Sequence, residues 1–167
     1  MMELVSVLAG LRWTDRPRCT HPALAELARV INDRLPDGEQ ARLAPYAPQL
    51  VGLRPKDLRV TPSLVQLCID AREPAPASGA PRRRARRAAR RLQAACGGRH
   101  RWWLTVTEPF YRTGSRQAID DAVLEVARGP HPARELVALF ERAVTLCTYL
   151  RDSSAAPRQP APSPQPG

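Results

Sequence analysis

Apolar residues in this chain recur at intervals of three and four residues, which is the spacing of one face of an α-helix. The strongest such pattern consists of Leu24, Leu27, Ala28, Ile31 and Leu35. Thr20 or His21 is expected to cap this helix, because Pro22 follows at a position where its missing N–H costs nothing. The segment from Pro36 to Gly38 is expected to end it.

The same spacing predicts four more helices. A short one lies near the N-terminus, one runs from Thr61-Pro62 to about residue 72, and one is capped by Ser115 and stopped at Gly129. The longest begins at His131-Pro132 and runs to about residue 151. Their apolar positions are Leu4, Val5, Leu8 and Leu11; Leu64, Val65, Cys68 and Ile69; Ile119, Val123, Val126 and Ala127; and Leu136, Leu139, Phe140, Ala143, Cys147 and Leu150.

Two segments give weaker signals. Prolines at 45, 48 and 55 restrict residues 39–58 to one or two short helical turns, around 39–44 and 46–51. Residues 100–106 have some strand character, but the chain offers no partner strand, so a loop or helical turn is expected there.

Composition divides the chain into ordered and linking parts. Residues 73–81 hold three prolines and no apolar side chain larger than alanine, which is typical of a linker. An arginine-rich helix with a thin alanine seam follows over 82–96. The Pro/Ala/Ser/Gln tail, residues 152–167, is expected to be disordered. We therefore predict an all-α fold, an irregular bundle of five to seven helices in which 1–72 and 82–151 pack together as one domain.

Charge is concentrated in one stretch. The chain carries 26 Lys and Arg against 16 Asp and Glu, and nine of the arginines lie between 81 and 101 with no acid among them. The rest carries 17 basic against 16 acidic residues. Such an element binds nucleic acid, another polyanion or an acidic partner, and its alternative role is a merely solvated helix face. It lacks the bulky apolar face that anchors a helix in a membrane, so no membrane insertion is expected.

The polyanion-binding hypothesis assigns contacts to seven arginines, Arg82, Arg83, Arg84, Arg86, Arg87, Arg90 and Arg91. Trp102 and Trp103 follow closely and are candidates for stacking on bases. All basic residues except Lys56 are arginine. This preference suits phosphate contact, but a GC-rich genome also produces it.

The chemistry of an enzyme or a metal site is poorly represented. Cys19 and His21 could join Cys96 and His100 in a zinc site, but the glycines at 97 and 98 interrupt the second pair and no C-x-x-C spacing exists. There is no phosphate-cradling glycine loop, and Asp121 with Glu125 is more typical of the wet side of a helix. We expect no catalytic residue, no metal and no cofactor, with Trp13 and Cys19 buried and His21 at a helix start.

The segment Trp13-Thr-Asp-x-Pro-x-Cys-Thr-His-Pro22, continuing through Asn32-Asp33 to Leu53, resembles a group of short helical proteins of high-GC actinobacteria. The resemblance covers about residues 11–70 and implies no known activity. It implies a bacterial context, and it suggests that Trp13, Cys19, His21, Asn32 and Asp33 form one local cluster.

The N-terminal apolar run has no cationic lead of the kind that secretory signals carry, and no apolar stretch approaches the roughly 20 residues of a membrane span. A cytoplasmic location is therefore expected. The function that these observations favour is non-catalytic binding of a polyanion, with nucleic acid first. The alternative is a helical protein-interaction domain in which the arginine run is incidental.

Overall fold

The computed structural model describes the backbone of residues 1–55, 57, 59–71 and 101–155, together with their side chains except at 101–113 and 155. These residues form six α-helices and one 3-10 helix, and none of them lies in a strand. The all-α prediction is confirmed. The helices are α1 (Met2–Leu8), α2 (Pro22–Arg34), α3 (Ala47–Leu50), α4 (Val60–Asp70), α6 (Arg101–Ala127) and α7 (Pro132–Ala155), with the 3-10 helix Glu39–Tyr46 before α3.

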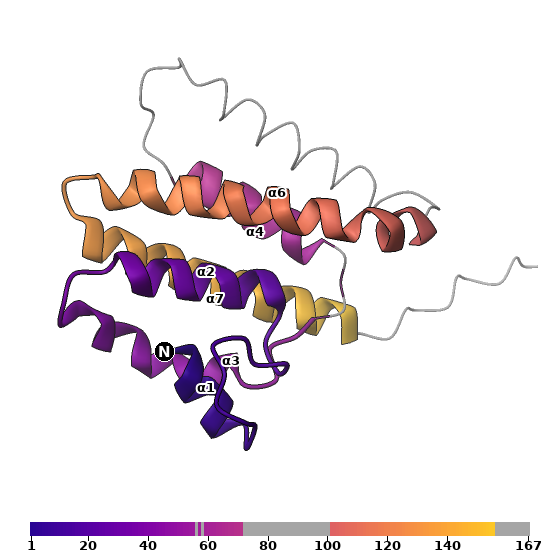
Figure 1. The fold of residues 1–167 in the computed structure, drawn as a ribbon, viewed down its shortest axis with the longest axis horizontal. Coiled ribbons are helices and arrows are strands. Elements are labelled where there is room, and N and C mark those ends of the chain that lie inside the picture. Colours follow the sequence, from indigo (N-terminus) through magenta and orange to yellow (C-terminus); the bar gives the residue numbers. More distant parts are fainter. Residues whose placement is uncertain (56, 58, 72–100, 156–167) are drawn as a thin grey trace, which may run out of the picture.

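The two longest helices, α6 and α7, form an antiparallel hairpin on which the N-terminal helices pack (Figure 1). Helices α2 and α4 each contact both α6 and α7, and α1 contacts α3 and α2. The turn between α6 and α7 passes through Gly129, where an added Cβ would lie 3.1 Å from the Val126 carbonyl oxygen and 2.9 Å from Glu135 Oε2. A larger residue at this turn would therefore require the Glu135 side chain and the Val126 carbonyl group to shift.

The core is apolar and draws on both halves of the chain. The predicted apolar positions of α2, α4 and α7 are all buried, from Leu24 to Leu35, from Leu64 to Ile69 and from Leu136 to Leu150. Phe140 on α7 is fully buried and meets the ring of Tyr46 edge to face, with the ring centroids 5.6 Å apart. The short turns predicted near 39–44 and 46–51 are the 3-10 helix and α3.

Several helix boundaries differ from the prediction. Ser115 does not cap a helix, because α6 begins at Arg101 and runs continuously through it. The loop or turn expected at 100–106 is the first part of α6. Packing against α2 and α4 sustains this helix even though it contains Gly114, a residue that disfavours helix interiors by about 1 kcal/mol.

Two other helix ends, the start of α4 and the end of α7, also differ from the prediction. Helix α4 begins one residue before Thr61, with Arg59 as its N-cap, so Thr61 is not the cap. Helix α7 extends to Ala155, so the first residues of the predicted tail, 152–155, are helical. Helix ends fray gradually, and the sequence carries no sharp signal that fixes either of these two boundaries.

The N-terminal helix exists as predicted but buries a different face. Met2, Val5 and Ser6 are buried, whereas Leu4 and Leu8 are exposed, as is Leu11 beyond the helix end. Trp13 was expected to be buried and is instead 75% exposed. A helix of seven residues, about two turns, is too short for its apolar pattern to define one face.

Candidate functional site

A small cavity of about 150 Å³ lies between the loop Asp15–Thr20, the first turns of α2, Arg54 and the α6 residue Arg116. Five arginines and two acidic residues line it, although the described residues as a whole hold equal numbers of basic and acidic side chains. The arginines are Arg16, Arg18, Arg29, Arg54 and Arg116, and the acidic residues are Asp15 and Glu26.

The loop that forms one wall is held to the body by its own polar groups. The buried Thr20 hydroxyl donates to the Leu50 carbonyl oxygen at 2.9 Å, and the His21 backbone N–H donates to the Leu53 carbonyl oxygen at 2.9 Å. Pro17 is buried, while Arg16 and Arg18 on either side of it are exposed. The backbone is therefore fixed where it presents these two side chains.

His21 caps α2, as one of the two predicted alternatives. Its Nδ1 accepts a hydrogen bond from the Ala23 N–H at 3.3 Å, and Pro22 occupies the first helical position. Burial, helped by the positive charge of Arg54, lowers the pKa of His21 to about 4. The imidazole is thus neutral at pH 7, which it must be for Nδ1 to accept a hydrogen bond.

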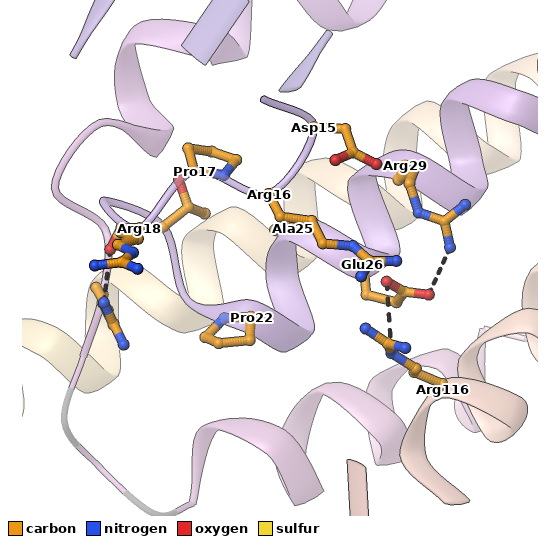
Figure 2. Close-up of a pocket in the computed structure, with 11 residues that line it drawn as sticks. Asp15, Arg16, Pro17, Arg18, Pro22, Ala25, Glu26, Arg29 and Arg116 are labelled. Atoms are coloured by element: carbon orange, nitrogen blue, oxygen red, sulfur yellow. Dashed lines mark hydrogen bonds and ion pairs between the residues drawn. The ribbon is translucent and has the colours of Figure 1, made fainter. Parts of the chain in front are cut away.

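Glu26 organises the other end of the cavity. Its side chain is 10% exposed and pairs with Arg29 at 2.6 Å and with Arg116 Nε at 3.7 Å (Figure 2). Figure 2 also shows the Arg16 side chain extending toward the same carboxylate. The hydrogen bond to Glu26 raises the pKa of Arg29, against the effect of partial burial. Glu26 therefore fixes two guanidinium groups between α2 and α6.

The remaining arginines of the cavity have no acidic partner among the described residues. Neither Arg16 nor Arg18 forms an ion pair with a described carboxylate, and Arg54 donates through Nη1 to the backbone carbonyl oxygen of Arg18 at 2.8 Å. The buried Nε of Arg29 also has no hydrogen-bond partner. The cavity consequently carries an excess of positive charge.

A wider groove beside the cavity provides a contrast. It encloses about 520 Å³ along α2 and α6 and shares Glu26, Arg29 and Arg116 with the cavity. Its three arginines face three carboxylates, and Arg34 pairs with Asp120 at 3.5 Å. The groove is electrically balanced, so the positive excess is confined to the smaller cavity, to which we refer as the arginine pocket.

The structure does not describe the arginines that are predicted to bind a polyanion. Arg82, Arg83, Arg84, Arg86, Arg87, Arg90 and Arg91 lie outside the described residues. The backbone of Trp102 and Trp103 lies in the first turn of α6, and their side chains are outside the described part of the chain. The stacking role therefore stays a prediction.

The structure describes only some of the candidate ligands of the hypothetical zinc site. Cys19 is half-buried, with its sulfur 3.8 Å from the Thr20 hydroxyl, and Cys96 and His100 lie outside the described residues. Within the described ranges, no group of three or more His, Cys, Asp or Glu residues could hold a metal ion. Burial raises the pKa of both Cys68 and Cys147 to about 12, which keeps these thiols protonated and unreactive.

Two further predictions can be compared with the structure. Asp121 and Glu125 are on the exposed side of α6, and Arg128 lies 3.8 Å from Glu125, as expected for a wet helix face. The local cluster suggested by the resemblance does not form. His21 and Asn32 lie near opposite ends of α2, 11 residues or roughly 16 Å apart along its axis.

Exposed large apolar side chains gather near the N-terminus. Of the seven among the described residues, five lie between Leu4 and Trp13, and Val51 beside α3 is a sixth. Helix α1 contacts α3, so these segments are neighbours. Surfaces of this kind mark interaction sites more often than isolated apolar residues do.

Sequence reasoning did not find the arginine pocket. The arginines come from four separate segments, and only the pair flanking Pro17 is close in sequence. Arg16 and Arg18, which precede the helix start at His21-Pro22, are the only signal in the sequence from which this pocket could have been predicted.

No family model, curated protein or solved structure matches the chain. Among the described helices, none is both long and apolar enough to cross a membrane.

Proposed function

We propose that this protein is a non-catalytic helical binding protein of the cytoplasm that contacts nucleic acid through the arginines of residues 82–91. The observation that carries the proposal is the unequal distribution of charge between the described residues and the rest of the chain. The described residues contain 15 basic and 15 acidic side chains, so the net charge of +10 belongs to the other segments. A neutral helical body attached to a dense cationic stretch suits a partner that is itself a line of negative charge.

Phosphate contacts determine the expected behaviour. A protein that neutralises about six phosphates of duplex DNA loses roughly a thousandfold in affinity between 50 and 200 mM salt, because bound counterions are released on association. Base sequence has little effect on such contacts. The proposal therefore predicts steep salt dependence and weak sequence preference.

The test compares the full chain with a variant in which the seven arginines of 82–91 are alanine. Fluorescently labelled duplex DNA and single-stranded RNA are titrated at several salt concentrations. The matched control replaces exposed arginines of the body, Arg42, Arg128 and Arg134. Loss of binding in the first variant alone, with an unchanged melting temperature, supports the proposal. Equal binding by both variants contradicts it, as does failure of the wild type to bind at low salt.

A second variant separates guanidinium chemistry from charge. Replacing the same seven arginines with lysine keeps every positive charge but removes the planar, bidentate donor. If the arginines are selected for phosphate contact, this variant binds more weakly than wild type. If they reflect codon usage, the two proteins bind equally well.

Protein interaction is the second candidate function, and the exposed apolar residues of α1 and its following loop favour it. Trp13 has the side-chain type most enriched at interface hot spots, and it is 75% exposed. Val7→Asp and Leu8→Asp would abolish such an interaction without touching the core. Affinity purification with each variant, beside the 82–91 variant, shows which surface holds a partner.

A further inference from the structure

Helix α1 and the loop after it present an apolar surface to the solvent, at the edge of the bundle opposite α6 (Figure 1). This α1 surface consists of Leu4, Val7, Leu8, Leu11 and Trp13. The other face of α1 is buried against the body. Except for Glu3 and Ser6, every residue of the helix is apolar. A helix that is apolar on both sides is normally covered on both sides, and the described part of the chain covers only one.

Hydrogen bonds at the end of α1 fix the shape of this surface. Gly10 adopts the left-handed conformation, with φ at 65°. Its N–H donates to the Val7 carbonyl oxygen at 3.0 Å. The Leu11 N–H donates to the Ser6 carbonyl oxygen at 2.8 Å. These two bonds form a Schellman motif, which sets the position of Leu11 beside the last turn of the helix.

The buried Ser6 side chain holds the rest of the loop. Its hydroxyl donates to the Glu3 carbonyl oxygen at 2.7 Å and accepts from the Thr14 N–H at 3.2 Å. The loop that carries Trp13 is therefore attached to the helix at both of its ends. A surface that is already fixed loses little conformational freedom when it binds, which favours association.

The size of the α1 surface matches what a second copy of the chain needs. Its five side chains are between 40% and 75% exposed and together present roughly 500 Å², since a whole large side chain presents about 150–250 Å². A standard interface buries about 800 Å² on each side, and about 65% of it is apolar between identical chains, which again is roughly 500 Å². The α1 surface alone therefore supplies the apolar part of such an interface.

The order of the apolar residues suits an antiparallel copy. In a two-fold dimer, residue i of one copy contacts residue j of the other, and j contacts i. A two-fold axis that passes between Val7 and Leu8 sets each of these residues opposite the other. It also sets Leu4 opposite Leu11 of the second copy, because both lie equally far from the axis along the chain.

Charged residues at the two ends of the segment favour the same direction. The Glu3 side chain is 41% exposed and contacts the Met1 amino group through Oε2 at 3.3 Å. Arg12 is exposed and forms no ion pair with a described carboxylate. An antiparallel pair brings Glu3 of each copy toward Arg12 of the other, whereas a parallel pair sets like charges together, which is unfavourable.

We infer that the α1 surface binds a second copy of this chain, as an antiparallel α1–α1 pair with two-fold symmetry. The inference rests on the protein-interaction surface that is the second candidate function above, and it names the partner of that surface. It is independent of the proposed contact between residues 82–91 and nucleic acid.

Sedimentation of the full-length protein by analytical ultracentrifugation between about 1 and 100 μM tests the inference, because the dimer fraction rises with concentration. A monomer–dimer equilibrium is expected. Val7→Asp should weaken it at least about 100-fold, because the dimer would then bury two unpaired carboxylates. Tyr149→Asp is the matched control, since Tyr149 is 67% exposed on α7 and should leave dimerisation unchanged. Thermal unfolding followed by circular dichroism checks that both variants are folded.

Exchanging the end charges tests the antiparallel arrangement. Glu3→Arg and Arg12→Glu each turn two attractive pairs into repulsive ones, so each should weaken the dimer about tenfold. An equimolar mixture of the two variants should form a heterodimer about as tightly as wild type, because every introduced charge then faces its opposite. Failure of the mixture to associate better than either variant alone would contradict the arrangement.

The inference is overturned if the protein stays monomeric at the highest concentration, or if Val7→Asp dimerises as tightly as wild type. Two other occupants of the α1 surface would also overturn it. Binding of a monomeric chain to vesicles of anionic phospholipid, lost in Val7→Asp, would assign the surface to a lipid bilayer. Capture of a different protein by a monomeric chain, lost in the same variant, would exclude the second copy and leave the second candidate function standing.

Discussion

Replacing Glu26 with glutamine is expected to destabilise the protein. Glutamine keeps the size of the side chain but removes its charge. Glu26 is 10% exposed, accepts a hydrogen bond from Arg29 at 2.6 Å and forms an ion pair with Arg116 at 3.7 Å. The change thus leaves two guanidiniums without their anion at the wall of the arginine pocket.

The loss of stability follows from the burial of the two pairs. Exposed ion pairs contribute about 0–1 kcal/mol, and removing one partner of a fully buried pair costs about 3–5 kcal/mol. The Arg29 side chain is 33% exposed and that of Arg116 is 51% exposed. The Arg29 pair is therefore intermediate and the Arg116 pair adds little. We expect a decrease of about 1–2 kcal/mol in the free energy of unfolding.

Urea unfolding followed by circular dichroism measures this effect. A double-mutant cycle with Arg29→Gln isolates the coupling between the two side chains, which should be about 1 kcal/mol. Glu39→Gln, which breaks the exposed pair with Arg42, is the control and should leave the free energy of unfolding unchanged. The reasoning is refuted if Glu26→Gln leaves stability within about 0.3 kcal/mol of wild type.

Three other changes have defined outcomes. The neutral His21 stabilises the fold fully above about pH 6.5, and this contribution is lost as pH falls toward 4, because the unfolded imidazole takes up the proton first. His21→Asn retains a capping side chain, so wild type should lose about 2 kcal/mol more than the variant between pH 7 and 4.5 in urea unfolding; parallel pH profiles would contradict this. Phe140→Ala should cost about 3–5 kcal/mol because the side chain is fully buried, whereas Tyr149→Ala, at a 67% exposed position, should stay within about 0.5 kcal/mol. Ser115→Ala should stabilise by about 0.5–1.5 kcal/mol, since the buried hydroxyl has no hydrogen-bond partner among the described residues and alanine favours the helix, and a lower melting temperature would refute this.

Local pattern accounts for most of the helices. Leu24 to Leu35 and Leu136 to Leu150 repeat over several turns, and a long repeat defines one buried face regardless of what packs on it. His21-Pro22 and His131-Pro132 mark helix starts, because a capping residue and a proline act within one turn. These features depend on residues that are neighbours in the chain.

The features that the sequence predicted wrongly depend on residues that are distant in the chain. Ser115 has the side chain of a cap, but contacts with α2 and α4 carry α6 past it in both directions. Trp13 has the side chain of a core residue, but no other part of the described chain covers it. Propensity is a weak guide where tertiary packing decides.

The arginine pocket is the plainest case of tertiary determination. The sequence by itself determined the helical class, the long apolar faces and the concentration of charge at 82–91, all of which follow from composition and spacing. Only the tertiary structure brought Arg16, Arg18, Arg54 and Arg116 around one cavity, while pairing Arg34 with Asp120 a short distance away. Whether an arginine is neutralised or left without a carboxylate depends on which segments meet across the fold, and spacing along the chain does not contain that information.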